Sequence, residues 1–237
     1  MSGIFKFKQF SIDQSNCAMK VNTDGVLLAA LCKSNSPSKI LDIGTGTGLI
    51  ALILAQRFTN AQIDAVEIDE AAAATAVRNF KNSKFSSRLN LISSSIENYF
   101  LHSELTYDLI VSNPPFFINS LRSDNPKKEL ARHTDITFFE KILNESESKL
   151  NSEGALWLIL PLGTSFLIRE MVSKMKSLKL QEEILIRSFS DSVPHRSIMK
   201  FGFGNSESVL RDFIIYKERG LYSQEYRELL KDFLTIF

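Results

Sequence analysis

The chain turns from its first long apolar run into a helix through the glycine-rich stretch Ile40-Leu41-Asp42-Ile43-Gly44-Thr45-Gly46-Thr47-Gly48. The residues before the first glycine are typical of a buried parallel strand. Residues 49–58 are apolar on nearly every side, as in a helix that packs on a sheet. Glycines at such a junction allow a sharp turn and let a ligand approach the backbone closely. The stretch therefore predicts the first strand–helix unit of an α/β sheet, with a ligand site at the turn.

Strand-like and helix-like segments alternate from residue 39 to residue 216. This alternation predicts an α/β fold with a Rossmann-like, doubly wound sheet of seven strands, and such sheets bind ligands at the carboxyl ends of their strands. The last two strands are expected to pair antiparallel, and Thr137 with Glu140 is expected to cap a helix over residues 136–150. The expected strands span residues 39–43, 63–68, 89–92, 107–112, 155–160, 180–189 and 209–216, and the other helices span residues 49–58, the segment that begins at the alanines 71–74, and residues 166–178.

Two segments lie outside this alternation. Residues 1–36 precede the first strand, and we expect them to form an extension that covers the ligand site. Within it, Thr23 and Asp24 are expected to cap a short helix. Residues 222–237 space Tyr, Leu and Phe as an amphipathic helix does, which predicts a helix docked on apolar surface. Residues 37–237, with this helix, are expected to form a single domain.

The composition excludes several classes of protein. The formal net charge is +1, far less basic than that of dedicated nucleic-acid binders. No apolar run reaches transmembrane length and the N-terminus lacks a signal-peptide pattern, so we expect a cytoplasmic protein without membrane contact. Cys17 and Cys32 form neither a disulfide framework nor a metal-ligand spacing, which predicts reduced thiols and no bound metal. The sequence leaves the oligomeric state open, with a monomer as the expectation.

The spacing of the glycines discriminates between nucleotide ligands. A dinucleotide fingerprint, G-x-G-x-x-G, needs glycine at position 49, where the chain has Leu49. The P-loop lysine is missing as well, which argues against ATP. Glu67 lies 19 residues (67 − 48) after Gly48, at the end of the second expected strand. A carboxylate there can accept hydrogen bonds from both hydroxyls of a ribose, while Asp69 is expected to cap the next helix.

The tetrapeptide Asn113-Pro114-Pro115-Phe116 follows the strand expected at residues 107–112 and so faces the same ligand site. Two consecutive prolines form a stiff turn whose carbonyl groups stay free. The exocyclic nitrogen of adenine is a poor nucleophile because its lone pair is delocalised into the ring. The Asn113 amide oxygen and the Pro114 carbonyl can accept its two N–H bonds and localise that lone pair, so positioning and electrostatics replace a general base. Phe116 can stack on the base.

Both motifs resemble those of the class I S-adenosylmethionine-dependent methyltransferases, the D-x-G-x-G-x-G stretch their motif I and the Asn-Pro-Pro-Phe tetrapeptide motif IV of the amino-methyltransferases. The resemblance implies S-adenosylmethionine as cofactor and S-adenosylhomocysteine as product. It implies that Asp42 lies near the cofactor's amino group, that Glu67 holds its ribose and that Ile68 flanks its adenine. Ser95 stands where many relatives have an aspartate for that adenine. The implied catalytic residues are Asn113, Pro114 and Phe116, and the implied cofactor-binding residues are Thr23, Asp42, Gly44, Gly46, Gly48, Glu67, Ile68, Ser95, Ile96 and Asn113.

Three interpretations of the acceptor compete: an RNA or DNA adenine, a protein glutamine methylated at N5 as in release-factor methyltransferases, and no acceptor at all in a non-catalytic scaffold. Residues 5–10, 17–29, 66–69 and 131–133, together with the two motifs, resemble the bacterial family that methylates N6 of adenosine 37 in valine tRNA. The resemblance implies that reaction, in the anticodon loop. Glutamine methyltransferases usually carry a separate helical domain, for which residues 1–36 are too short, and a scaffold predicts a damaged motif.

Basic residues in two segments are expected to contact the tRNA. Residues 122–133 follow the loop that carries the tetrapeptide and hold four basic residues against Asp124 and Glu129, a net charge of +2 (4 − 2). Two further lysines lie in the N-terminal extension, where they can reach phosphates. The alternative is a solvated loop and a frayed arm. The expected RNA-binding residues are Lys6, Lys8, Arg122, Lys127, Lys128, Arg132 and His133.

Overall fold

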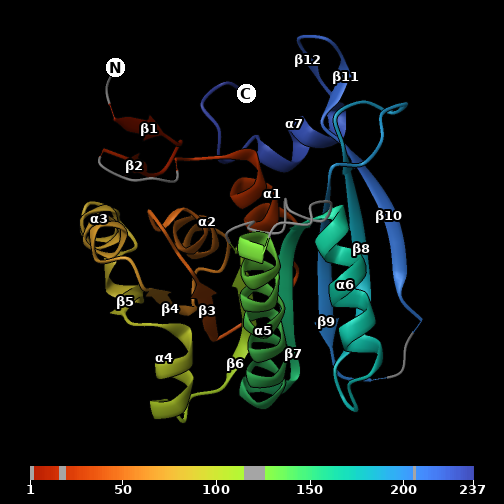
Figure 1. Cartoon of the computed structure of the whole chain (residues 1–237). Helices are drawn as coiled ribbons and strands as arrows, with labels where there is room; N and C mark the ends of the chain where they lie inside the picture. Colours follow the sequence, from red (N-terminus) through yellow and green to blue (C-terminus); the bar gives the residue numbers. More distant parts are fainter. Residues whose placement is uncertain (1–2, 16–19, 115–125, 205–206) are drawn as a thin grey trace.

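The computed structural model describes residues 3–15, 20–114, 126–204 and 207–237, and of residues 126–135 it describes the backbone alone. Within these residues the chain folds around one eight-stranded sheet in the order β10-β8-β9-β7-β6-β3-β4-β5 (Figure 1). Strand β9 runs antiparallel to both neighbours, and all other pairs are parallel. The predicted α/β, doubly wound fold is confirmed. The strands are β3 Lys39–Ile43, β4 Gln62–Glu67, β5 Leu89–Ser93, β6 Tyr107–Ser112, β7 Leu150–Pro161, β8 Lys179–Arg187, β9 Arg196–Gly202 and β10 Val209–Ile214.

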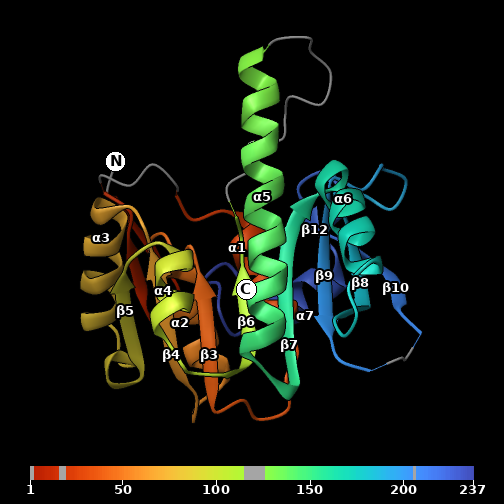
Figure 2. The ribbon, with the colours of Figure 1, turned by 60° about the horizontal axis from the view of Figure 1, so that its bottom comes forward.

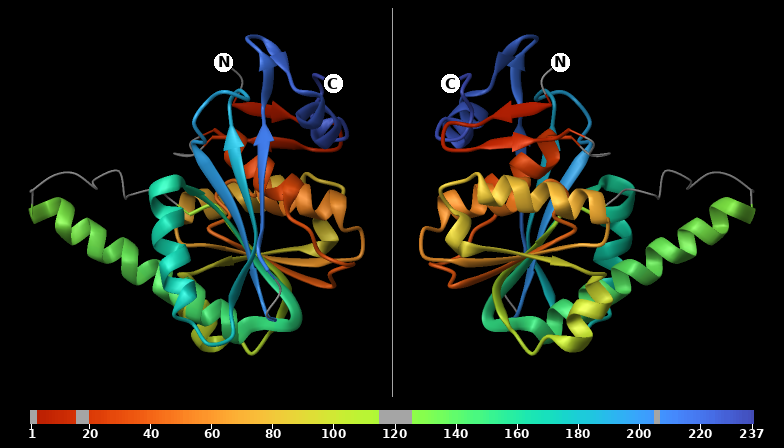
Figure 3. Two further views of the ribbon diagram at one scale, coloured as in Figure 1. Left: turned by 90° about the vertical axis from the view of Figure 1, so that its right-hand side faces the viewer. Right: turned by 90° about the vertical axis from the view of Figure 1, so that its left-hand side faces the viewer.

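Helices cover both faces of the sheet, so the domain has three layers (Figure 2, Figure 3). One hydrophobic core joins the sheet to α1, α2, α3 and α7, and a second core joins the opposite face to α4, α5 and α6. Burial of apolar side chains on both faces explains why the central strands read as continuous apolar runs. The helices are α1 Thr23–Leu31, α2 Leu49–Arg57, α3 Glu70–Lys81, α4 Ile96–His102, α5 Pro126–Lys149, α6 Leu162–Ser173 and α7 Gln224–Leu230, with a 3₁₀ turn at Ser86–Arg88.

The part of the sheet beyond β7 differs from the sequence prediction. The segment of β9 was not anticipated as a strand, and β8 and β10 pair in parallel. The prediction of an antiparallel final pair was therefore wrong, and the sheet has eight strands in the described residues rather than seven. Consecutive strands usually pair as neighbours. Here β9 pairs with β8 on one side and with β7 on the other. The free edge of β8 is then the place where β10 adds, and it runs parallel to β8.

Helix α5 begins earlier than its apolar face suggested. The backbone is helical from Pro126, and proline suits the first turn of a helix because its missing N–H would have no partner there. Thr137 and Glu140 therefore lie inside the helix, and the expected capping box at its start was wrong.

Side-chain caps begin two helices on the other face of the sheet. Asn22 caps α1, where its Oδ1 accepts a hydrogen bond of 2.8 Å from the backbone N–H of Gly25. The expected caps, Thr23 and Asp24, instead form the first turn of that helix. Asp69 caps α3 as predicted. Each of these caps pairs a backbone donor that the helix geometry leaves free.

The two chain ends meet on one side of the domain (Figure 3). The backbone N–H of Lys8 donates a hydrogen bond of 2.8 Å to the Phe233 carbonyl, and Phe7 forms an antiparallel bridge with Leu234. Because these backbone groups pair with the N-terminal segment, α7 ends at Leu230 and does not span residues 222–237 as predicted. Two small hairpins complete the described chain, β1 Ile4–Lys6 with β2 Ser11–Asp13, and β11 Tyr216–Glu218 with β12 Leu221–Tyr222.

Candidate active site

A cavity of about 530 Å³ opens at the carboxyl ends of β3, β4 and β6. This is the edge at which parallel α/β sheets bind their ligands. The cavity brings together the glycine turn, the end of β4, the start of α4 and the first two residues of the tetrapeptide. The sequence-predicted site residues that line it are Gly44, Gly46, Glu67, Ile68, Ile96, Asn113 and Pro114.

The three glycines of the turn serve two different purposes. All three have positive φ angles, 69° at Gly44, 58° at Gly46 and 84° at Gly48, which other residues rarely adopt. A Cβ atom on Gly44 or Gly46 would meet no atom of the described residues within 4 Å, so both leave open space above the turn. A Cβ on Gly48 would lie 2.4 Å from the ring of Phe80. Gly44 and Gly46 therefore face the cavity, while Gly48 allows α3 to pack against the turn.

Glu67 fixes the glycine turn through a hydrogen bond to its backbone. Its carboxylate is buried, and Oε2 accepts a hydrogen bond of 2.8 Å from the backbone N–H of Gly46. Oε1 accepts a hydrogen bond of 2.9 Å from the N–H of Asp69. Each carboxylate oxygen has a second lone pair. Because Glu67 lines the cavity, it can still accept hydrogen bonds from the hydroxyls of a ribose while it fixes the turn.

Asp42 lies beneath the turn and is fully buried. Its Oδ2 accepts hydrogen bonds from Thr45 Oγ1 at 2.6 Å and from the backbone N–H of Ala51 at 3.1 Å. Its Oδ1 has no hydrogen-bond partner among the described residues. Burial raises the pKa of Asp42 to about 7, although the hydrogen bonds from Thr45 and Ala51 lower it. A buried carboxylate with one unpaired oxygen is suited to a cationic ligand group nearby.

Asn113 presents an unsatisfied acceptor at the cavity wall. Its side chain is 9% exposed, and its Oδ1 is buried without a hydrogen-bond partner among the described residues. Such orphans are rare, since leaving a buried polar atom unpaired costs about 1–3 kcal/mol. The preceding Ser112 donates a hydrogen bond of 2.9 Å to the Ile43 carbonyl, which fixes the end of β6 against β3. Pro114 also lines the cavity. Pro115 and Phe116 lie outside the described residues.

Four predicted cofactor ligands do not line the cavity: Thr23, Asp42, Gly48 and Ser95. Ile68 is 71% exposed although it is large and apolar, which suits it to flank an aromatic ring in the cavity. The Ser95 hydroxyl accepts a hydrogen bond of 3.1 Å from the Asn98 N–H and caps α4, so it does not line the cavity. Its neighbours Ser94 and Glu97 line the cavity instead. Thr23, at the exposed start of α1, lies outside the lining.

Two of the predicted RNA contacts have described side chains. Lys6 is exposed in β1. Lys8 is also exposed, and its Nζ donates a hydrogen bond of 2.5 Å to the Lys231 carbonyl, which holds the N-terminal segment to the end of α7. The other predicted RNA contacts lie outside the described side chains; they are Arg122, Lys127, Lys128, Arg132 and His133.

One site residue was missed in the sequence. Asn79 is 2% exposed, and its Nδ2 donates hydrogen bonds of 2.8 Å to the Thr47 carbonyl and 3.0 Å to the Asp13 carbonyl. Its Oδ1 accepts a hydrogen bond of 2.8 Å from the Asp13 N–H. The available signal was its position beside Ala76 and Phe80 on the buried face of α3, because a buried amide needs partners. Asn79 thereby connects the N-terminal hairpin to the glycine turn.

The described residues contain no group of three or more His, Cys, Asp or Glu side chains that could hold a metal ion. Cys32 is buried and unpaired, and burial raises the pKa of its thiol to about 11, which makes it a poor nucleophile. Cys17 lies outside the described residues.

None of the described helices is long and apolar enough to cross a membrane.

Known proteins resemble the whole chain. Residues 16–188 match the family model of the methyltransferase small domain. Over 237 residues, all of both proteins, the chain is 47% identical to the tRNA1(Val) (adenine(37)-N6)-methyltransferase of Pedobacter heparinus. It is 39% identical to proteins of the same name from Parabacteroides distasonis and Christiangramia forsetii, with 97% of this chain and 96% of each relative covered.

Solved structures resemble the fold. A predicted O-methyltransferase from Agrobacterium tumefaciens superposes with a TM-score of 0.67 at 19% identity, covering 89% of this chain and 96% of that one. A putative RNA methyltransferase from Pyrococcus horikoshii gives a TM-score of 0.52 at 14% identity, covering 81% and 89%. At such identities the likeness shows the architecture alone.

Proposed function

The chain belongs to the methyltransferase small domain family and, within it, to the bacterial tRNA1(Val) (adenine(37)-N6)-methyltransferases, and from this premise we propose that it transfers a methyl group from S-adenosylmethionine to N6 of adenosine 37 in valine tRNA. It is a methyltransferase that modifies tRNA. The two finer parts of the proposal are that it acts on the anticodon loop and that it does so as a monomer.

The cavity fits S-adenosylmethionine in size and chemistry. Open space above Gly44 and Gly46 gives room for close approach to the backbone. Glu67 offers acceptors for the ribose, and the exposed Ile68 offers an apolar surface for the adenine ring. Asp42 lies buried beneath the turn, outside the cavity lining, and its Oδ1 has no partner among the described residues, so its charge is proposed to act on the amino group through the turn. The proposed cofactor-binding residues also include Thr23, Gly48, Ser95, Ile96 and Asn113, of which Gly48 and Ser95 act through the backbone they shape.

One observation carries the proposed chemistry: the Oδ1 of Asn113 is buried at the cavity wall and has no hydrogen-bond partner in the part of the chain that the structure describes. When bound, S-adenosylmethionine supplies an electrophilic methyl group on a sulfonium sulfur and leaves as S-adenosylhomocysteine. Asn113 Oδ1 accepts one N–H of the adenine amine, and the Pro114 carbonyl accepts the other. These two bonds turn the nitrogen lone pair toward the methyl group, and the acceptors are fixed in place before the reaction. The amine proton is lost to water, and Phe116 stacks on the flipped adenine.

Basic side chains of two segments are proposed to hold the tRNA. The exposed Lys6 and Lys8 lie on the segment beside α7, and Lys127 and Lys128 lie in the first turn of α5. Arg122, Arg132 and His133 complete the proposed set. Phosphate contacts of this kind fix the register of a nucleic acid on the protein. Joint substitution of Lys127 and Lys128 by Glu should weaken tRNA binding and leave cofactor affinity unchanged.

The direct test combines methyl transfer with nucleoside analysis. Purified protein is incubated with methyl-labelled S-adenosylmethionine and an unmodified valine tRNA transcript, and the digested tRNA is analysed for N6-methyladenosine. A transcript with guanosine at position 37 is the matched control, because guanine stacks as a purine but has an oxygen in place of the N6 amine. We expect label in the first transcript and none in the second. A protein that binds the labelled cofactor but methylates neither transcript would refute the acceptor assignment.

A further inference from the structure

A second cavity, of about 370 Å³, lies at the carboxyl ends of β8 and β10. Its lining is Phe189, Tyr216, Arg219, Gly220 and Tyr222, so three of its five residues are aromatic and one is a cation. None of these residues lines the larger cavity at β3, β4 and β6. The fold therefore has an aromatic cavity that the methyl-transfer chemistry does not use.

The aromatic rings of this cavity form an ordered row. Tyr216 stacks on Tyr222 with ring centroids 5.0 Å apart, and Tyr222 stacks on Tyr226 at 4.7 Å with an angle of only 7° between the rings. Phe189 lies in the loop that follows β8, and its ring centroid is 5.7 Å from that of Tyr216. All four rings are paired with one another, yet the three that line the cavity are only half-buried. Such a row is a stacking surface for a further planar ring.

The cavity lies at the same edge of the sheet as the active site. β8 and β10 run in the direction of β7 and β6, because β9 is antiparallel to both β7 and β8. Their carboxyl ends therefore point the same way as the end of β6, where Asn113 lies. Four strand spacings separate β6 from β10 in the sheet order, which is roughly 19 Å. That span is about six stacked nucleotides, so one RNA loop can reach both cavities.

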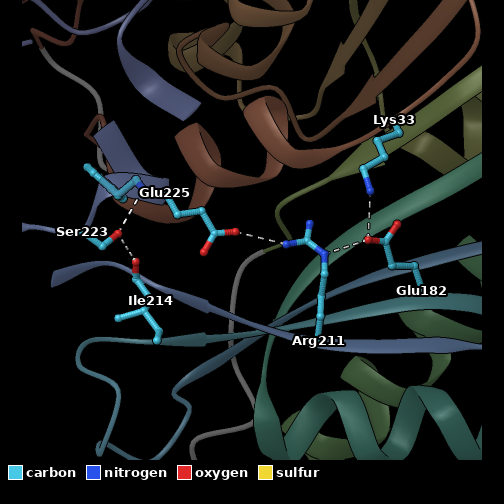
Figure 4. Close-up of polar contacts among 7 residues, drawn as sticks. Lys33, Glu182, Arg211, Ile214, Ser223 and Glu225 are labelled. Atoms are coloured by element: carbon cyan, nitrogen blue, oxygen red, sulfur yellow. Dashed lines mark hydrogen bonds and ion pairs between the residues drawn. The ribbon is translucent and has the colours of Figure 1, made fainter. Parts of the chain in front are cut away.

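Ion pairs and a hydrogen bond fix the chain on both sides of the β11–β12 hairpin (Figure 4). Arg211 on β10 pairs with Glu182 on β8 at 3.0 Å and with Glu225 on α7 at 3.5 Å. Ser223 donates a hydrogen bond of 2.6 Å to the Ile214 carbonyl and caps α7. These contacts fix the segment that carries Tyr216 and Tyr222 before any ligand arrives, which lowers the entropy cost of binding.

The charges at the hairpin favour a phosphate-bearing ligand. Arg219 and Lys217 form no ion pair with any residue that the structure describes, whereas Arg211 is already paired. Arg219 is exposed and lines the cavity. Gly220 at the tip has a φ of 81° and nothing within 4 Å of a Cβ position, so the approach to the rings is open on that side. Aromatic faces beside free cations match an unpaired nucleotide, whose base stacks and whose phosphate is anionic.

We propose that this cavity binds an unpaired nucleotide of the tRNA substrate other than the methylated adenosine. The base stacks on the row formed by Phe189, Tyr216 and Tyr222, and Arg219 contacts a phosphate. The site acts as a second anchor that fixes the position of the RNA loop, while base identity matters little because stacking tolerates every base. This inference rests on the proposed tRNA methyltransferase function.

The test measures tRNA binding by two variants and two matched controls. Phe189→Leu keeps apolar volume and removes an aromatic face, and Phe58→Leu makes the same change in a half-buried ring at the opposite edge of the sheet, after α2. Arg219→Ala removes the free cation, and Lys176→Ala removes an exposed cation at that opposite edge, after α6. The probe is the unmodified valine tRNA transcript, and its affinity is measured across a range of salt concentrations, beside affinity for S-adenosylmethionine.

We expect Phe189→Leu to weaken tRNA binding about tenfold. Arg219→Ala should reduce the slope of log affinity against log salt by about one, because one phosphate contact is lost. Both variants should bind the cofactor as the unaltered protein does, and both controls should bind tRNA normally. Because the Arg219 side chain is exposed and makes no described contact, its variant decides the question even if Phe189→Leu fails to fold.

Different results would refute the two proposals. If the unaltered protein methylates no adenosine in the transcript, the tRNA methyltransferase function itself falls. If it methylates adenosine 37 but Arg219→Ala keeps the full salt slope, the second anchor is refuted, and the cavity then serves a protein partner or none.

Discussion

The Asn79 side chain donates a hydrogen bond of 2.8 Å to the Thr47 carbonyl, inside the glycine turn. The same amide group makes two hydrogen bonds with the backbone of Asp13, in β2. One buried side chain therefore joins the N-terminal hairpin, α3 and the turn that lines the main cavity. The hairpin reaches the site through this link, which suggests that the N-terminal segment supports cofactor binding by fixing the turn.

Replacement of Asn79 by alanine should loosen this connection. The change leaves the Thr47 carbonyl and both backbone groups of Asp13 without their partner, so the free energy of unfolding should fall by about 2 kcal/mol. Affinity for S-adenosylmethionine should fall severalfold, because the turn loses a support. Asn90→Ala is the matched control, since within the described residues the Asn90 side chain makes one hydrogen bond, an exposed one to Asp64. Denaturant unfolding and calorimetric binding check both effects, and cofactor affinity equal to that of the control would contradict the link.

The two kinds of glycine in the turn should respond differently to alanine. Gly48→Ala places a Cβ against the Phe80 ring and strains a positive φ, so it should cost roughly 3 kcal/mol of stability. Gly46→Ala meets only open space and should cost about 1 kcal/mol, from the strain alone. It should nevertheless reduce cofactor affinity, because the added methyl group projects into the cavity.

Gly220→Ala is the control for this comparison, since it has a similar φ and open space around it but lies far from the main cavity in the sheet order. It should lose the same stability as Gly46→Ala and keep normal cofactor affinity. Equal cofactor affinity in the Gly46 and Gly220 variants would mean that the ligand does not approach Gly46.

Cofactor affinity should rise with pH near neutrality. Burial raises the pKa of Asp42 to about 7, so this carboxyl is mainly protonated at pH 6 and mainly charged at pH 8. A cationic amino group nearby favours the charged form and lowers this pKa, so binding is linked to loss of a proton. The dissociation constant for S-adenosylmethionine should fall up to about tenfold between pH 6 and pH 8. Asp42→Asn removes the titrating group, and a pH dependence that survives in this variant would assign it to another residue.

Local pattern predicted the parts of the fold that depend on neighbours in the chain. The β6 strand was predicted with the bounds that the structure has, and Asp69 was predicted as a cap. Both depend on a few adjacent residues, an apolar run before a turn or a polar side chain before a helix. The glycine turn and Asn113 were placed at one edge because the fold rule for parallel strands fixes which ends meet.

Contacts between distant segments could not be predicted in this way. The position of β9 between β7 and β8 depends on pairing across the sheet, which no local pattern encodes. The end of α7 at Leu230 depends on the N-terminal segment, which is more than 220 residues earlier in the chain and pairs with Phe233 and Leu234. Asn79 is similar, because its partners Thr47 and Asp13 lie on two other elements.

The last prediction separates catalysis from binding at Asn113. Its Oδ1 is buried without a described partner, so its replacement by alanine removes no hydrogen bond of the described fold, and stability should change little. If that oxygen accepts an N–H of the adenine mainly in the transition state, Asn113→Ala should lower kcat by about 10²–10³-fold. Affinity for S-adenosylmethionine should stay within about threefold, because Glu67 and the glycine turn remain.

Asn113→Asp keeps an acceptor at this position and should retain more activity than Asn113→Ala. Asn90→Ala, which alters an exposed amide bonded to Asp64, is the control. Single-turnover methylation of the valine tRNA transcript measures the chemical step. Loss of cofactor affinity as large as the loss of kcat would show that Asn113 serves binding, and the orphaned oxygen would then belong to the cofactor and not to the acceptor.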